Sequence, residues 1–124
     1  MKRLLTFAWI GWAATAGFGQ MFQPDPHRAD SLRQVLARPA ADTVRLSRLV
    51  GLAQFVPKNE RESVILEGFE LAEKVLRSMD ERDLPAFWTF SGQHALNNPI
   101  VFYQMRGNLN RALEFAHRGR VAAS

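Results

Sequence analysis

Apolar side chains recur every three or four residues along most of the chain, which is the spacing of one face of a helix. The pattern predicts a first helix over residues 31–38, with Asp30 as its N-cap and a proline directly after it. It predicts a second helix over residues 43–56, capped by Asp42. The residues expected to face inward from these two helices are Leu32, Val35, Leu36, Leu46, Leu49, Val50, Ala53 and Val56.

A longer helix is predicted over residues 60–78. Asn59 and Glu62 have the spacing of a capping box, with Asn in place of Ser or Thr. A polar connector follows over residues 79–83, and Asp83 is expected to cap a short helix that carries a proline in its first turn. The inward residues of the long helix are expected to be Ile65, Phe69, Ala72, Val75 and Leu76.

The next helical segment, residues 93–106, is interrupted by Pro99. Because an internal proline costs about 3 kcal/mol, two interpretations stay open. Either one helix is kinked at Asn98, or Asn98 caps a new helix that begins with Pro99.

A turn signal, Gly107–Asn108, precedes the last predicted helix, residues 109–122. The inward residues of this helix are expected to be Leu109, Ala112, Leu113 and Ala116. No segment alternates in the two-residue pattern of a strand, and the connectors between the helices are short. The predicted fold class is therefore all-α, built from antiparallel helix hairpins.

The first 19 residues have the pattern of a secretory signal peptide. A lysine and an arginine precede the uncharged residues 4–18, and small residues follow. We expect cleavage directly after Gly19, with cleavage after Ala16 as the alternative. An uncleaved membrane anchor is the other interpretation, although the apolar run is shorter than the roughly 20 residues of a spanning helix.

Export therefore follows from the sequence as an expectation, to the periplasm or outside the cell. Contact with a membrane is expected only through the N-terminal segment, if it stays uncleaved. Cleavage would leave residues 20–29, which contain two prolines and no apolar period, as a flexible leader. Residues 30–124 would then form the helical domain.

Removing the signal peptide changes the charge of the chain. Of its 16 Lys and Arg residues, two lie in residues 1–19, so 14 remain against 12 Asp and Glu, a net charge of +2. Basic and acidic side chains alternate along the predicted helices, which is typical of solvated faces and gives no reason to expect nucleic acid as a partner. The chain has no cysteine, so its stability must come from packing.

Residues 95–116 resemble one tetratricopeptide repeat (TPR). Leu96 matches the bulky residue early in the first helix of such a repeat, Tyr103 matches the aromatic, and Gly107–Asn108 matches the turn. The small residues of the second helix are matched by Ala112, Ala116 and Gly119. Their spacing lets two helices approach closely, and Tyr103 is large enough to fill the gap opposite them.

The resemblance has two departures, since Pro99 and Ile100 replace the usual leucine and glycine. It implies a short TPR-like solenoid with one clearer repeat over about residues 93–122 and a more divergent one over about residues 42–77. A solenoid usually needs about three repeats. The last face is therefore expected to be covered by self-association, by a partner or by further repeats in a longer chain.

The resemblance also implies a groove for a protein or peptide partner. In that family, the groove is lined by side chains of the first helix that lie off the packing stripe. Amides suit this role because they can bond a peptide backbone in either sense. The groove residues implied here are His94, Asn97, Asn98, Val101, Gln104 and Met105.

An aromatic-rich group is the most apolar part of the mature chain. Core packing is the favoured interpretation of this group, and an exposed docking patch is the alternative. Its members are Phe87, Trp88, Phe90, Phe102 and Tyr103.

No constellation of residues predicts catalysis. The three histidines lack metal-ligand spacing, Ser63 and Ser91 lack a G-x-S-x-G context, and no phosphate-binding glycine motif is present. We therefore expect no metal, no cofactor and no enzymatic activity. The function expected is that of an exported TPR-like scaffold for protein–protein interaction.

The alternative function is that of the extracytoplasmic sensor segment of a truncated bacterial signalling protein, such as a histidine kinase. The exported N-terminal regions of such proteins are similar to this chain in the run Asp30-Ser31-Leu32, in Asp42–Thr43 and in the Glu-Leu-Ala-Glu-Lys segment, residues 70–74.

Overall fold

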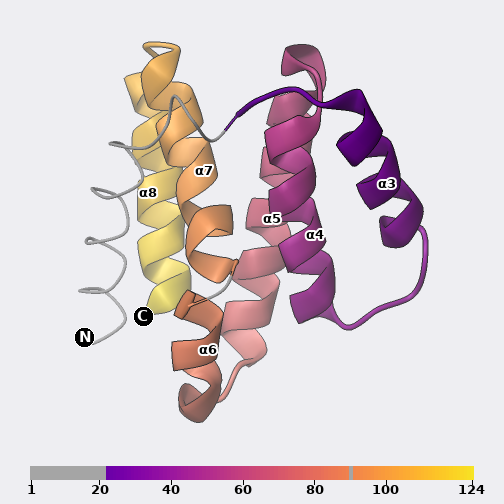
Figure 1. The fold of residues 1–124 in the computed structure, drawn as a ribbon. Helices are drawn as coiled ribbons and strands as arrows, with labels where there is room; N and C mark the ends of the chain where they lie inside the picture. Colours follow the sequence, from indigo (N-terminus) through magenta and orange to yellow (C-terminus); the bar gives the residue numbers. More distant parts are fainter. Residues whose placement is uncertain (1–21, 90) are drawn as a thin grey trace.

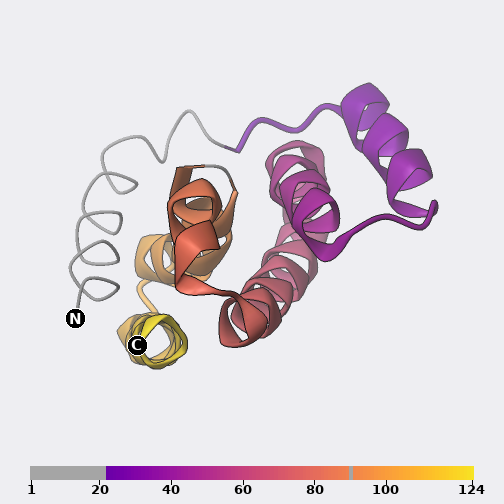
Figure 2. The same cartoon turned by 90° about the horizontal axis from the view of Figure 1, so that it is seen from below.

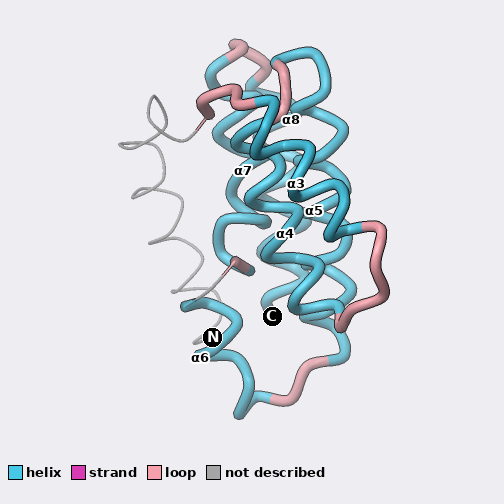
Figure 3. Tube along the Cα trace, turned by 45° about the vertical axis from the view of Figure 1, so that its right-hand side comes forward, coloured by secondary structure: helices cyan, strands magenta, loops and turns pink. Residues whose placement is uncertain are grey.

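The computed structural model describes residues 22–89 and 91–124, and within these ranges the chain is helical without a strand (Figures 1 and 3). The predicted all-α class is confirmed. The predicted signal peptide, residues 1–19, lies outside the described residues. The described elements are α3 (Pro26–Leu36), α4 (Asp42–Phe55), α5 (Lys58–Ser78), the 3₁₀ turn η1 (Glu81–Asp83), α6 (Leu84–Thr89), α7 (Gly92–Met105) and α8 (Leu109–Ala123).

Two antiparallel hairpins make up most of the molecule. The first consists of α4 and α5, the second of α7 and α8, and they lie side by side with α5 against α7 (Figure 1). The helix α3 packs on α4, so that α3 and α8 lie at opposite ends of the stack (Figure 2). The short α6 lies below the start of α7 (Figure 1). None of the helices in the described ranges is long and apolar enough to cross a membrane.

The first described helix begins earlier than the apolar pattern predicts. Asp25, not Asp30, is the N-cap, and its Oδ1 accepts a hydrogen bond from the Arg28 backbone N–H at 3.2 Å. Pro26 occupies the first turn, where its missing N–H costs nothing. Ala29 is only 1 % exposed. The prediction of a flexible leader is therefore wrong for residues 26–29, which are helical.

The predicted side-chain caps of the first hairpin are also wrong. Asp42 is the first residue of α4 instead of its cap, and α5 follows Pro57 without a capping side chain. Asn59 lies inside α5, so the expected capping box does not form. The Glu62 carboxylate instead accepts a hydrogen bond from the Tyr103 hydroxyl, which links the two hairpins.

Arginines of the following helix bind the C-terminal carbonyls of α3 and α4. Arg45 and Arg48 of α4 each donate from Nη1 to a carbonyl in the last turn of α3 at 3.2 Å. Arg61 of α5 donates to two carbonyls at the end of α4, at 3.2 and 3.1 Å. The Val35 carbonyl also accepts from the Arg38 backbone N–H at 3.1 Å. All four carbonyls lie at the negative end of a helix dipole, where a guanidinium is favourable.

Pro99 lies within α7, which runs without interruption from Gly92 to Met105. The interpretation in which Asn98 caps a separate helix is therefore wrong. Pro99 is among the most fully buried side chains, and this packing offsets the lost backbone hydrogen bond.

The turn between α7 and α8 follows the sequence signal closely. Gly107 has a φ of 75°, a conformation that favours glycine. The Asn108 N–H donates to the Tyr103 carbonyl at 2.9 Å and the Gly107 N–H to that of Gln104 at 3.0 Å, which is a Schellman motif. Asn108 then caps α8 by accepting from the Arg111 N–H at 3.2 Å.

The core lies between α4, α5, α7 and α8. All the inward residues predicted for α4 and α5 are buried. Aromatic rings join the two hairpins, since Phe69 of α5 meets Phe115 of α8 edge-on at 4.9 Å between ring centroids. Tyr103 of α7 stacks on Phe115 at 5.7 Å. A smaller apolar cluster holds α3 against α4 through Ala29, Leu52 and Val56.

The inward face of α8 differs from the prediction. Leu109 and Leu113 are 62 % and 68 % exposed, and Ala116 is half-buried, so only Ala112 of the predicted set is buried. The helix is turned so that its aromatic and smallest residues face α5 and α7, which allows a close approach. The buried residues of α8 are Ala112, Phe115, Gly119, Ala122 and Ala123.

Candidate binding site

A pocket of about 580 Å³ lies between the first half of α4 and the η1–α6 segment. Its size is within the range of roughly 300–1,000 Å³ typical of small-ligand sites. Gly92 at the start of α7 and Met79 directly after α5 also line it. The lining residues are Thr43, Val44, Leu46, Ser47, Arg48, Met79, Asp83, Ala86, Phe87, Ser91 and Gly92.

The pocket combines apolar walls with a few polar groups. Aliphatic and aromatic walls come from α4, α6 and Met79, and hydroxyl groups come from Thr43, Ser47 and Ser91. One residue of each charge, Arg48 and Asp83, also lines it. Such a surface can bury an apolar group and hydrogen-bond the polar atoms beside it.

Close packing at the start of α7 fixes one wall of this pocket. A Cβ atom on Gly92 would lie 2.3 Å from the Phe87 ring, so the ring occupies the space that any other residue would need. Phe87 also meets Trp88 edge-on, with 5.1 Å between ring centroids. The glycine thus lets α6 approach α7 and places the Phe87 ring as the wall.

The predicted groove residues of α7 do not form one exposed surface. Asn97, Asn98 and Val101 are 1 %, 3 % and 3 % exposed, so their side chains are not accessible to a partner in this structure. Of the others, His94 is half-buried, whereas Gln104 and Met105 are exposed.

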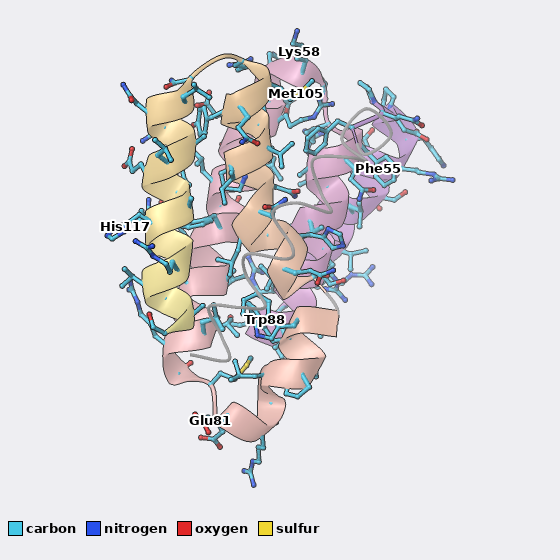
Figure 4. The ribbon with its side chains drawn as sticks, turned by 90° about the vertical axis from the view of Figure 1, so that its left-hand side faces the viewer. Phe55, Lys58, Glu81, Trp88, Met105 and His117 are labelled. Atoms are coloured by element: carbon cyan, nitrogen blue, oxygen red, sulfur yellow. The ribbon has the colours of Figure 1, made fainter. Side chains whose placement is uncertain are left out.

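The pocket lies at the start of α7, whereas Gln104 and Met105 lie at the end of this helix. Figure 4 shows Met105 near one end of α7 and Trp88 beneath the other. None of the six groove residues lines the pocket, so a role in partner binding stays a prediction for the three that are accessible.

Two polar groups of α7 are desolvated. Neither the Nδ2 nor the Oδ1 atom of Asn97 has a hydrogen-bond partner, which costs about 1–3 kcal/mol for a buried amide. Burial also lowers the pKa of His94 from its usual 6.5, which favours the neutral imidazole.

Most of the residues predicted to pack a repeat are buried. Leu96, Tyr103, Ala112 and Gly119 are buried, whereas Ala116 lies at the edge of the interface and Gly107 forms the exposed turn. Burial and the hydrogen bond to Glu62 raise the pKa of Tyr103 above 10.0, so the phenol keeps its proton.

Most of the aromatic group predicted from the sequence belongs to the core. Phe87, Phe102 and Tyr103 are buried and Trp88 is half-buried, which confirms the core interpretation for the first three. Phe90 lies outside the described residues. The pocket itself was missed, because its lining combines the first half of α4 with a segment that lies more than thirty residues away in the sequence. The high apolar content of residues 86–90 was the one available signal.

Comparison with protein-family models, curated proteins and solved structures finds no match for this chain. Among the described residues, no group of three or more His, Asp or Glu side chains is arranged to hold a metal ion.

Proposed function

We propose that this chain is an exported, non-catalytic, TPR-like module that binds a protein or peptide. The pocket between α4 and α6 is the observation that supports this proposal best. It is open to solvent, largely apolar and large enough for a bulky side chain of a partner. Thr43 and Ser47 line it, and their hydroxyl groups can both donate and accept hydrogen bonds to the backbone of a partner.

The position of the pocket agrees with this role. Residues of α4 and of the start of α7, the first helices of the two hairpins, both line it. In TPR proteins the first helices line the binding groove, and the proposal places the partner against the first half of α4 and the start of α7. The short α6 would then act as one wall of the groove.

Export is the part of the proposal that rests on the sequence of residues 1–19. Expression in a bacterial host with a C-terminal tag tests it directly. Mass spectrometry of the product is expected to show a mature chain that begins at Gln20, or at Gly17 if cleavage follows Ala16. An intact N-terminus in the cytoplasmic fraction would contradict export.

A displayed peptide library tests the binding function. Selection on the purified chain is expected to enrich peptides that share an apolar anchor residue. The variant Ala86→Trp fills the pocket from an exposed position, and it should weaken binding of these peptides at least tenfold.

The matched control is Ser63→Trp, which adds the same ring at an exposed position of α5 outside the pocket and should bind normally. Circular dichroism would first establish that both variants are folded. A selection without a common anchor, or peptides that bind Ala86→Trp as well as the wild-type chain, would refute the proposal.

A further inference from the structure

A second surface, separate from the pocket, lies on α8. Leu109 and Leu113 are one helical turn apart and therefore share a face of this helix. Ala116 and Arg120 extend that face by two more turns, and we call these four residues the α8 stripe. Both leucines are more than 60 % exposed, which is unusual for two adjacent large apolar side chains.

The architecture explains why this face is open. The two helices of the first hairpin are both covered, because α7 packs on α5 and α3 packs on α4. Within residues 22–89 and 91–124, α8 has no helix on its outer side. His117, one turn beyond Leu113, lies on the side of α8 turned away from α7 (Figure 4). A helix is therefore the shape that continues the packing of the stack.

The charges around the α8 stripe are mostly positive. Arg111 is paired with Glu114 at 3.0 Å, and Arg118 is paired with Glu73 at 2.6 Å. Arg106 and Arg120 have no carboxylate within 4.0 Å in the described part of the chain. Arg120 instead contacts the His117 ring nitrogen at 3.1 Å. A guanidinium without a counter-charge thus lies within the stripe, and another lies in the turn just before it.

These charges argue against a second copy of the chain as the occupant. A symmetric pair of α8 helices would bring the unpaired arginines of both copies into one interface, where like charges repel. They favour a partner that supplies carboxylates. We propose that the α8 stripe binds an amphipathic helix of another protein, with apolar residues against Leu109 and Leu113 and acidic residues facing Arg106 and Arg120.

This surface is independent of the pocket, so the two proposals can fail separately. A displayed library of helical peptides, selected on the purified full chain, supplies the probe. The enriched helices are expected to carry apolar residues at three- and four-residue spacing, flanked by Asp and Glu. Their affinity should fall when the salt concentration is raised, because the unpaired arginines are exposed to solvent.

Three variants locate the binding surface. Leu113→Asp should weaken binding of the enriched helices at least tenfold. Val121→Asp is the matched control, because Val121 is 57 % exposed on the same helix but lies off the stripe, and it should leave binding unchanged. Arg120→Glu should reverse the charge preference, so that Lys versions of the same helices bind better than Glu versions.

An enriched pool that is not acidic, or helices that bind Leu113→Asp with wild-type affinity, would overturn the proposal. Light scattering that shows a wild-type dimer, dissociated by Leu113→Asp, would assign the surface to a second copy instead. Binding that is lost in Ala86→Trp but kept in Leu113→Asp would place the helices in the pocket and would also overturn it.

Discussion

The ion pair between Glu73 and Arg118 offers the sharpest test of how the two hairpins are held together. Arg118 of α8 donates to both carboxylate oxygens of Glu73 in α5, at 2.6 and 3.3 Å. Its guanidinium also lies over the rings of Phe69 and Phe115, at 5.0 and 5.1 Å from their centroids. The Glu73 side chain is 9 % exposed, whereas that of Arg118 is 37 % exposed.

The variant Arg118→Leu removes the cation and leaves the buried carboxylate nearly alone. Breaking a buried pair in this way costs about 3–5 kcal/mol. Two features reduce the cost here. Arg118 is partly solvated, and Arg77 stays 3.8 Å from Glu73 on the surface. We therefore expect a loss of about 2–3 kcal/mol in the free energy of unfolding, which lowers the melting temperature by roughly 10–20 °C in a domain of this size.

The double variant Glu73→Leu/Arg118→Leu separates electrostatics from packing. Replacing both partners by apolar residues leaves no orphaned charge, and such replacements are often neutral. Its free energy of unfolding should lie within about 1 kcal/mol of the wild-type value, well above that of Arg118→Leu.

Urea denaturation followed by circular dichroism measures all these variants without adding salt that would screen the pair. Arg120→Leu is the control, since Arg120 is exposed on the same helix, and it should change stability by less than about 0.5 kcal/mol. The reasoning is refuted if Arg118→Leu is as stable as this control, or if the effects of Glu73→Leu and Arg118→Leu simply add.

Three further predictions concern single residues. Gly107→Ala should destabilise the chain by about 1–2 kcal/mol because alanine is strained at a φ of 75°. Gly68→Ala should stabilise it by about 0.5–1 kcal/mol, because alanine favours the helix more than glycine and its Cβ would meet only an ordinary contact at 3.8 Å. Thermal melts in which both variants shift the melting temperature in the same direction would contradict this. Gly92→Ala should cost about 1–3 kcal/mol by displacing the Phe87 ring, and a melt unchanged from wild type would show that the ring moves freely. Burial lowers the pKa of His94 below 6.5, so the unfolded chain binds this proton more tightly than the folded chain does. The contribution of His94 to stability should therefore be full above this pH and be lost below it. His94→Gln should reduce the change in the urea midpoint between about pH 7 and pH 5, and a pH dependence equal to that of the wild type would show that another group titrates there.

The sequence predicted α4 and α5 well because their apolar residues are large and strictly periodic. Leu46, Phe69 and Leu76 are buried, and each lies on the single apolar face of its helix, so the period correctly predicts which face turns inward. On α8 the same reasoning failed at Leu109 and Leu113. The larger residues there lie outside, because close packing against α7 requires Ala112 and Gly119, and Phe115 supplies the apolar contact. Hydrophobicity alone therefore predicted the wrong inward face for α8, because the short distance between α8 and α7 requires small residues there.

The candidate site shows a different limit. The groove residues implied by the TPR resemblance share one helix, so the sequence could predict their spacing. It could not predict that Asn97 and Val101 are buried. The pocket depends on how α6 folds back below the start of α7 (Figure 1). The close contact between Gly92 and Phe87 fixes this placement, and the periodic pattern of apolar residues does not predict such a contact.

The arginines that bind the ends of α3 and α4 have a consequence for how the molecule opens. Carbonyls in the last turn of each helix accept hydrogen bonds from arginines of its successor, so docking of the next helix stabilises each end. Loosening of α4 would release the terminal carbonyls of α3 at once. Amide hydrogen exchange should then report matching opening free energies for the last turn of α3 and the first turns of α4, as expected for one cooperative unit.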